Sequence, residues 1–105
     1  MNLKEFNIYQ QEVINKSITN GIDPSSFAKP HIDEFKMQIA ARALEEGINL
    51  SKYLEDFDFY QLNEIRLTLK SKLNVAHIAK KGLSYLEMQA CRLKLIKDNL
   101  VLGFA

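Results

Sequence analysis

Few residues in this sequence have the types and spacing that metal binding requires. Its two histidines, His31 and His77, lie far apart along the chain. His31 stands near Asp33 and Glu34, an arrangement that could hold a metal ion weakly, but a histidine in such a connecting segment is usually solvated. We expect both histidines at the surface and no metal site.

Nucleophilic or acid–base chemistry is equally poorly supported. Cys91 is the single cysteine, which excludes an intrachain disulfide and a cysteine-based zinc site. It lies on an apolar stripe, so we expect a small buried hydrophobic side chain. Carboxylates are paired at 33–34, 45–46 and 55–58, where helix capping and solvation explain them, and the four dispersed glycines form no phosphate-binding loop. We therefore expect no enzymatic activity, no cofactor and no small-molecule substrate.

The charge distribution is more informative than the net charge of +1. Residues 33–65 hold eight acidic and three basic side chains, a balance of −5, whereas residues 66–97 hold one acidic and eight basic, a balance of +7. Three interpretations of the basic segment are open. It contacts phosphates, it pairs with an acidic surface of another molecule, or it is ordinary solvated surface. Its candidate contact residues are Arg66, Lys70, Lys72, Lys80, Lys81, Arg92, Lys94 and Lys97.

Length and composition indicate one globular domain. The chain has 105 residues, 47% of them hydrophobic and 26% charged, which suits a packed core without disulfides or metals. The first residues are polar, and the longest apolar run, at 100–105, is far shorter than the roughly 18–20 residues of a membrane-spanning helix. Together with the lone cysteine, these features predict a cytoplasmic protein without membrane contact.

An internal repeat of about 25 residues covers nearly the whole chain. Four stretches, 18–24, 44–50, 69–75 and 96–102, begin with an apolar residue followed by three polar or small ones, and their starts are 26, 25 and 27 residues apart. We therefore expect one helical domain over 1–105, with units at about 1–21, 22–47, 48–72 and 73–99 and a truncated tail at 100–105.

Each unit is expected to contain a short helix and a long helix. Asp33, Asp58 and Ser84 suit helix N-caps, and Gly21, Gly47, Lys72 and Asn99 are expected to end the long helices. Long helices are predicted at 4–19, 34–46, 59–71 and 85–98, and short ones at 24–28, 50–54 and 75–80.

Apolar residues recur at helical spacing within the long helices. The clearest sets are Leu62, Ile65 and Leu69, and Met88, Cys91 and Leu95; looser ones are Phe6, Tyr9 and Val13, and Met37, Ile39 and Leu44. One unit cannot bury such a stripe alone, so neighbouring units must stack. The expected fold class is all-α, an α-solenoid-like array of degenerate helix-pair repeats.

The repeat also resembles a known type of sequence. The residues that carry the resemblance are Leu62, Ile65, Arg66, Leu69, Leu73, Asn74 and Val75. Matching residues in the neighbouring repeats are Gly47, Ile48, Asn49, Tyr53, Met88, Cys91, Arg92, Leu95 and Leu100. They are similar to short helical repeats of uncharacterised proteins from Gram-positive bacterial mobile elements and phages. The resemblance implies a small accessory protein and no particular activity.

A second pattern is similar to a DNA-binding helix-turn-helix. Ile78 and Ala79 would pack its first helix, Gly82 would form the turn, and Ser84 would begin the recognition helix. The spacing between alanine and glycine is one residue short, and the repeat explains the same residues without that fault.

The C-terminal tail adds a candidate contact. We expect residues 100–105 to fold back and cap the last long helix; otherwise Leu100, Leu102 and Phe104 form an exposed apolar patch. Tyr53, Tyr60 and Tyr85 are either interface anchors or core residues.

The function predicted from these features is a non-enzymatic interaction or scaffold module that binds a protein partner or itself, through the C-terminal two units and the tail. The alternative is a nucleic-acid-binding accessory protein that uses the basic segment 66–97.

Overall fold

The computed structural model describes residues 2–103 of the chain, and the side chains of residues 2–99. These residues form α1 (Ile8–Thr19), α2 (Glu34–Glu45), α3 (Phe59–Lys70) and α4 (Tyr85–Gly103), with 3-10 helices η1 (Leu3–Glu5), η2 (Pro24–Ser26), η3 (Ser51–Tyr53) and η4 (Val75–His77). The expected all-α class is confirmed. None of the helices within residues 2–103 combines the length and apolar content needed to cross a bilayer.

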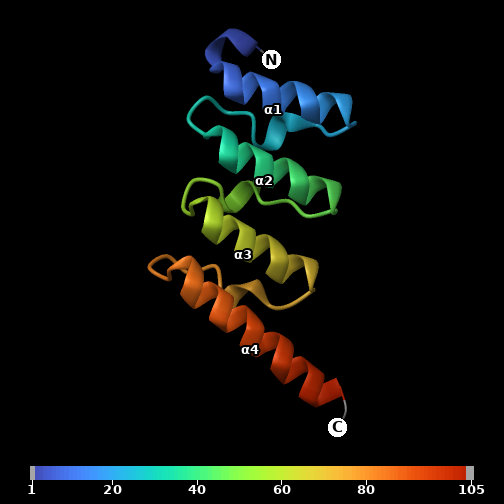
Figure 1. Cartoon of the computed structure of the whole chain (residues 1–105), viewed down its shortest axis with the longest axis vertical. Coiled ribbons are helices and arrows are strands. Elements are labelled where there is room, and N and C mark those ends of the chain that lie inside the picture. The colour runs from blue at the N-terminus through green and yellow to red at the C-terminus, as the bar shows by residue number, and fades with distance from the viewer. Residues whose placement is uncertain (1, 104–105) are drawn as a thin grey trace.

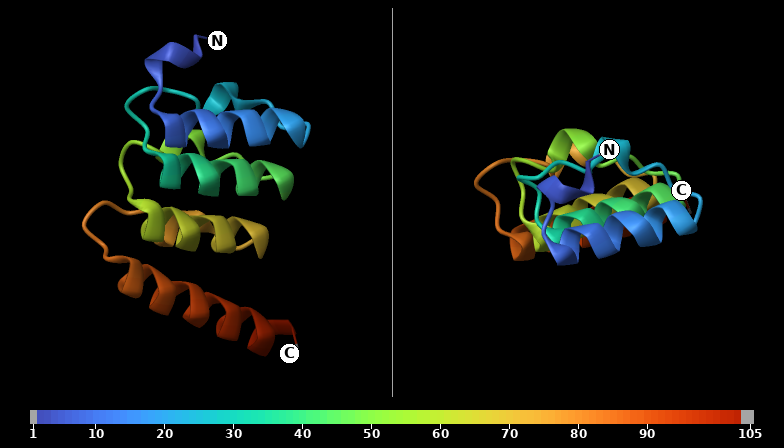
Figure 2. Two further views of the ribbon diagram at one scale, coloured as in Figure 1. Left: turned by 45° about the horizontal axis from the view of Figure 1, so that its top comes forward. Right: turned by 90° about the horizontal axis from the view of Figure 1, so that it is seen from above.

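The α-helices stack one after another along the long axis of the molecule, each packed on the next (Figure 1). The 3-10 helices η2, η3 and η4 lie in the connecting segments, which form a second layer beside the α-helices (Figure 2). The molecule is accordingly elongated, with extents of 55 × 29 × 17 Å.

Local capping explains where the α-helices begin. The Asp33 and Asp58 side chains accept hydrogen bonds from the N–H groups of Lys36 and Gln61, and Ser84 accepts one from Glu87, as predicted. Asn7 does the same for Gln10. The helix predicted from residue 4 therefore begins only at Ile8, after the separate turn η1.

The first three α-helices end in the same way. Gly21, Gly47 and Lys72 have positive φ angles of 76°, 78° and 57°. In each case the next N–H group donates to a carbonyl five residues earlier, as in Ile22 to Ser17, which closes the helix end. These stop residues were predicted correctly.

Lys72 holds this left-handed conformation without the freedom of glycine. The φ of 57° at Lys72 costs an L-residue about 1–2 kcal/mol. Glycine avoids this cost, but it has greater conformational freedom in the unfolded chain, and the loss of that freedom on folding offsets part of the gain. We expect Lys72→Gly to raise the free energy of unfolding by about 1 kcal/mol, measured by urea titration. Gly47→Ala is the reciprocal control and is expected to lower it; a Lys72→Gly protein less stable than wild type would contradict this account.

The prediction for the fourth long helix was wrong at its C-terminal end. Asn99 does not end α4, which continues to Gly103, so residues 100–103 do not fold back onto it. The structurally equivalent stop position, fourteen residues after the N-cap in the first three units, is Asp98 in the fourth. The helix continues through Asp98, which does not adopt the left-handed conformation seen at Gly21, Gly47 and Lys72.

The core lies between the two layers. The residue that follows each of η2, η3 and η4 is fully buried: Phe27, Leu54 and Ile78. From the α-helices, Ile14, Met37, Leu62, Ile65 and Met88 complete the interior. The predicted stripes at 62–69 and 88–95 therefore face the core, with Cys91 half-buried rather than buried.

Polar side chains tie each α-helix to the segment that leads into the next. Gln10 Nε2 donates to the Ile32 carbonyl at 2.6 Å, and Gln61 Nε2 to the Leu83 carbonyl at 2.7 Å. Lys36 Nζ, at the equivalent position of α2, donates to the Leu54 carbonyl at 2.8 Å. These contacts fix the order and spacing of the stack and thereby position the surface that the α-helices share.

Candidate interaction surface

The predicted basic segment does not form a continuous basic surface, because acidic residues of the preceding units neutralise part of it. Arg66 of α3 is only 3% exposed, and its Nη1 lies 2.6 Å from Glu46 Oε1. Lys70 pairs with the other Glu46 oxygen. The expectation that Arg66 contacts a partner was wrong, since it is committed to the α2–α3 contact.

Two more basic residues also pair with acidic residues that lie earlier in the chain. Arg92 of α4 donates from Nε to the buried Glu64 of α3 at 2.7 Å. Lys81 Nζ lies 3.2 Å from Asp56 Oδ1. The acidic middle of the chain therefore meets the basic part within one molecule. The candidates Lys72, Lys80, Lys94 and Lys97 are exposed and form no ion pair within the described residues.

The Glu46 carboxylate accepts hydrogen bonds from two cationic side chains, Lys70 and Arg66. These bonds, of which the one from Lys70 has the larger effect, lower the pKa of the Glu46 carboxyl below its ordinary value. A carboxylate with a lowered folded-state pKa stabilises the fold above its unfolded pKa, and this contribution is lost as the pH falls through the folded pKa.

We therefore expect Glu46→Gln to be less stable than wild type at neutral pH. The difference in free energy of unfolding should shrink as the pH falls below about 4.3, the ordinary glutamate pKa. Urea titrations of both proteins across this range test the expectation. A difference that stays constant at all pH values would show that the Glu46 charge contributes nothing.

The tail residues among the predicted contacts are only partly defined. Leu100 and Leu102 belong to the continuous helix α4, and their side chains, like Phe104, lie outside the described residues.

A row of exposed apolar side chains crosses all four α-helices. Its members are the second residues after the four N-caps, and they are 63%, 55%, 60% and 58% exposed: Tyr9, Phe35, Tyr60 and Leu86. We call these four residues the aromatic row. Tyr9 was expected on a buried stripe, and this expectation was wrong; Tyr60 was expected either at an interface or in the core, and it lies at the surface. The usable signal was the recurrence of a large apolar residue at one position after every cap.

Neighbouring rings join part of the aromatic row into one apolar surface. The Phe35 and Phe59 ring centroids are 6.4 Å apart, those of Phe59 and Tyr60 5.4 Å, and those of Tyr60 and Tyr85 5.2 Å. Such edge-on and tilted ring contacts are favourable in themselves. They hold the rings in place while leaving much of Phe35, Tyr60 and Tyr85 exposed to solvent.

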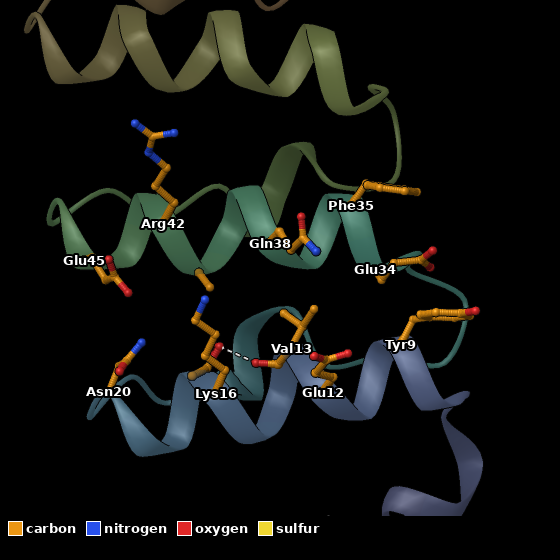
Figure 3. Close-up of a pocket in the computed structure, with 12 residues that line it drawn as sticks. Tyr9, Glu12, Val13, Lys16, Asn20, Glu34, Phe35, Gln38, Arg42 and Glu45 are labelled. Carbon is orange, nitrogen blue, oxygen red and sulfur yellow. Dashed lines mark hydrogen bonds between the residues drawn. The ribbon is translucent and has the colours of Figure 1, made fainter.

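A groove of about 740 Å³ lies between α1 and α2 at one end of the aromatic row. Tyr9 and Phe35 line one end of the groove, and Lys16, Asn20 and Glu45 line the other (Figure 3). The apolar side chains of Val13 and Ala41 also line the groove. The groove therefore has aromatic side chains at one end and charged side chains along its length.

The remaining candidate residues lie elsewhere. His31 and His77 are exposed, as predicted. His31 Nε2 lies 2.8 Å from Glu55 Oε1, and not beside Asp33 or Glu34. Tyr53 is half-buried against the core, with its ring 6.2 Å from that of Phe57. Within the described residues no group of three histidine, cysteine or acidic side chains is arranged to hold a metal ion.

The helix-turn-helix alternative finds little structural support. The segment that would supply its first helix contains only the three-residue turn Val75–His77. Ser84 does begin a long helix, but a recognition helix needs the preceding helix to place it on the DNA backbone.

The fold and these surfaces define a small all-helical protein with an exposed aromatic row and a groove between its first two α-helices. Part of the chain is similar to the intermembrane lipid transfer protein tipC of Dictyostelium discoideum, with 31% identity over 77 residues. The match covers 73% of this chain and 2% of that protein. No protein-family model and no solved structure matches the chain.

Proposed function

We propose that this protein is a non-enzymatic interaction module that binds a segment of a protein partner on the face carrying the aromatic row. The observation that supports the proposal is the row itself: Tyr9, Phe35, Tyr60 and Leu86 are each more than half exposed and come from equivalent positions of successive helices. Tyrosine and phenylalanine are enriched in protein–protein interfaces and depleted at ordinary surfaces. Exposed apolar side chains gathered in this way are the kind of patch that marks a contact.

Rigidity adds to this argument. The ring contacts from Phe35 through Phe59 and Tyr60 to Tyr85 hold the aromatic surface in a defined shape. Side chains that are already ordered lose less conformational entropy on binding than free ones. The row is therefore suited to supply the few anchors that dominate interface energies.

Selection of short random peptides displayed on phage, with the whole chain as target, tests the proposal. Selected peptides should lose at least about tenfold in affinity for the Phe35→Ser/Tyr60→Ser variant. Ile18→Ser is the matched control, because Ile18 is also an exposed apolar residue but lies outside the row; its effect should be small. A selection that yields no peptides, or peptides indifferent to Phe35 and Tyr60, would refute the proposal.

Nucleic-acid binding is the competing function, and fluorescence anisotropy with a labelled duplex separates the two. Phosphate contacts are strongest at low salt. The exposed lysines that remain for them are Lys72, Lys80, Lys94 and Lys97. We expect no duplex binding even at low salt; binding that weakens steeply with salt and disappears on changing these lysines to glutamate would favour the alternative.

Lipid transfer is not carried over from tipC, because the matched residues amount to 2% of that protein. The cytoplasmic location and the kinship with bacterial mobile-element proteins stay predictions from the sequence. Binding to a second copy of the chain is one of the partner types included in the proposal.

A further inference from the structure

The groove between α1 and α2 has the chemistry of a cation-binding site at its aromatic end. Tyr9 and Phe35 extend in the same direction there, and the Glu34 side chain lies between them in the view of Figure 3. Glu12 lines the same groove from α1. Aromatic faces attract a guanidinium or ammonium group, and nearby carboxylates add charge-assisted hydrogen bonds.

Carboxylates outnumber cations along the groove. Glu12, Glu34 and Glu45 line it together with Lys16 and Arg42. Figure 3 shows the Arg42 side chain directed away from α1, toward α3, whereas Lys16 reaches toward α2. The surface that meets an occupant of the groove is therefore acidic, although the chain as a whole carries a net charge of +1.

None of these charged side chains forms an ion pair within the residues that the structure describes. Between α2 and α3, and between α3 and α4, acidic and basic side chains pair across the helices: Glu46 with Arg66 and Lys70, and Glu64 with Arg92. In the described part of the chain no such ion pair joins α1 to α2. The contrast leaves the carboxylates of this one groove available to an external cation.

The shape of the groove indicates what kind of molecule carries that cation. A small-molecule site usually buries about 70–90% of its ligand, whereas this groove runs between two helices and is open to solvent. Tyr9 and Phe35 also continue into the aromatic row toward Tyr60. A protein segment could fill the groove and continue along the row.

We propose that the groove between α1 and α2 binds a basic segment of a partner protein, with an arginine side chain seated against Tyr9 and Phe35 and paired with Glu12 and Glu34. Arginine suits this place better than lysine, because its planar guanidinium stacks on rings and forms two parallel hydrogen bonds with a carboxylate. This inference rests on the proposed function and specifies the partner chemistry.

The phage-displayed random library tests this as well, since its peptides differ in charge. Peptides selected on the wild-type chain should be enriched in arginine. Their affinity, measured by fluorescence anisotropy, should fall at least about tenfold for Glu12→Gln/Glu34→Gln and when their arginines are replaced by neutral citrulline. The matched control is Glu5→Gln/Glu55→Gln, which removes two exposed carboxylates outside the groove and should change affinity by less than about twofold.

The possible results separate this inference from the proposed function. Peptides that depend on Phe35 and Tyr60 but are not basic, or that bind Glu12→Gln/Glu34→Gln as tightly as wild type, would overturn the basic-segment inference alone. A selection without any peptide dependent on the row would overturn both. If light scattering shows a wild-type dimer that dissociates in Glu12→Gln/Glu34→Gln, the occupant is a second copy and the inference is equally overturned.

Discussion

Replacing Phe27 with alanine is expected to lower the free energy of unfolding by about 4 kcal/mol, within the range for deleting a buried phenyl ring. Phe27 follows η2 and is fully buried in the core between the connecting layer and the α-helices. Alanine would leave a cavity there, since the surrounding side chains relax only partly. Urea denaturation followed by circular dichroism measures the loss.

The matched control is Phe35→Ala, which removes the same ring from the aromatic row. Because Phe35 is 55% exposed, its truncation should change the free energy of unfolding by less than about 1 kcal/mol. Equal losses at the two positions would mean that Phe35 is a packing residue, and the argument for an interaction surface would lose its main support. A small loss at Phe27 would mean that the connecting layer does not form part of a cooperative core.

The local structure could be predicted from the sequence because it depends on neighbouring residues. Asp58 needs only the N–H group of Gln61 to begin α3, and Gly47 needs only its own backbone freedom to end α2. Such capping interactions are the same in any tertiary context. Hence the predicted starts of α2, α3 and α4 agree with the structure. The predicted end of α4 at Asn99 does not, because the helix continues to Gly103.

The candidate site could not be predicted in the same way, because it depends on how successive helices are rotated and spaced. Arg66 was expected to be a free basic side chain, yet Glu46, twenty residues earlier, lies within hydrogen-bonding distance of it. A one-residue difference in the connecting segment would change which side chains face each other across two helices. The balance of −5 and +7 along the sequence is thus in part an internal complementarity, because Arg66, Lys70, Lys81 and Arg92 pair with acidic residues of the preceding units.

Tyr9 shows where helical periodicity failed to predict burial. Its spacing with Phe6 and Val13 fits a helical stripe, but Phe6 precedes α1 and does not share its period. Once the helix is started at Ile8, Tyr9 falls on the outward side with Phe35 and Tyr60. Periodicity therefore identified the residues of the core stripe in α3 and α4, and failed where the helix start was misplaced.

Removal of Arg92 should have the second large effect on stability. Arg92 and Glu64 have side chains 13% and 6% exposed, and Arg92 Nε donates to Glu64 Oε2 at 2.7 Å. Deleting one partner of such a pair leaves a charge in a site that excludes water. We therefore expect Arg92→Leu to lower the free energy of unfolding at neutral pH by about 3 kcal/mol, measured by urea denaturation.

The double variant Glu64→Leu/Arg92→Leu distinguishes the charge from the packing. Apolar replacement of both partners often costs little or even stabilises a protein, because neither desolvated charge remains. We expect the double variant to recover most of the loss caused by Arg92→Leu. Equal instability of the single and double variants would instead mean that Arg92 acts through the packing of its aliphatic part against α3, because removal of the orphaned carboxylate would then bring no benefit. Recovery would establish that the α3–α4 contact tolerates an apolar pair, and that the ion pair adds little net stability to this contact.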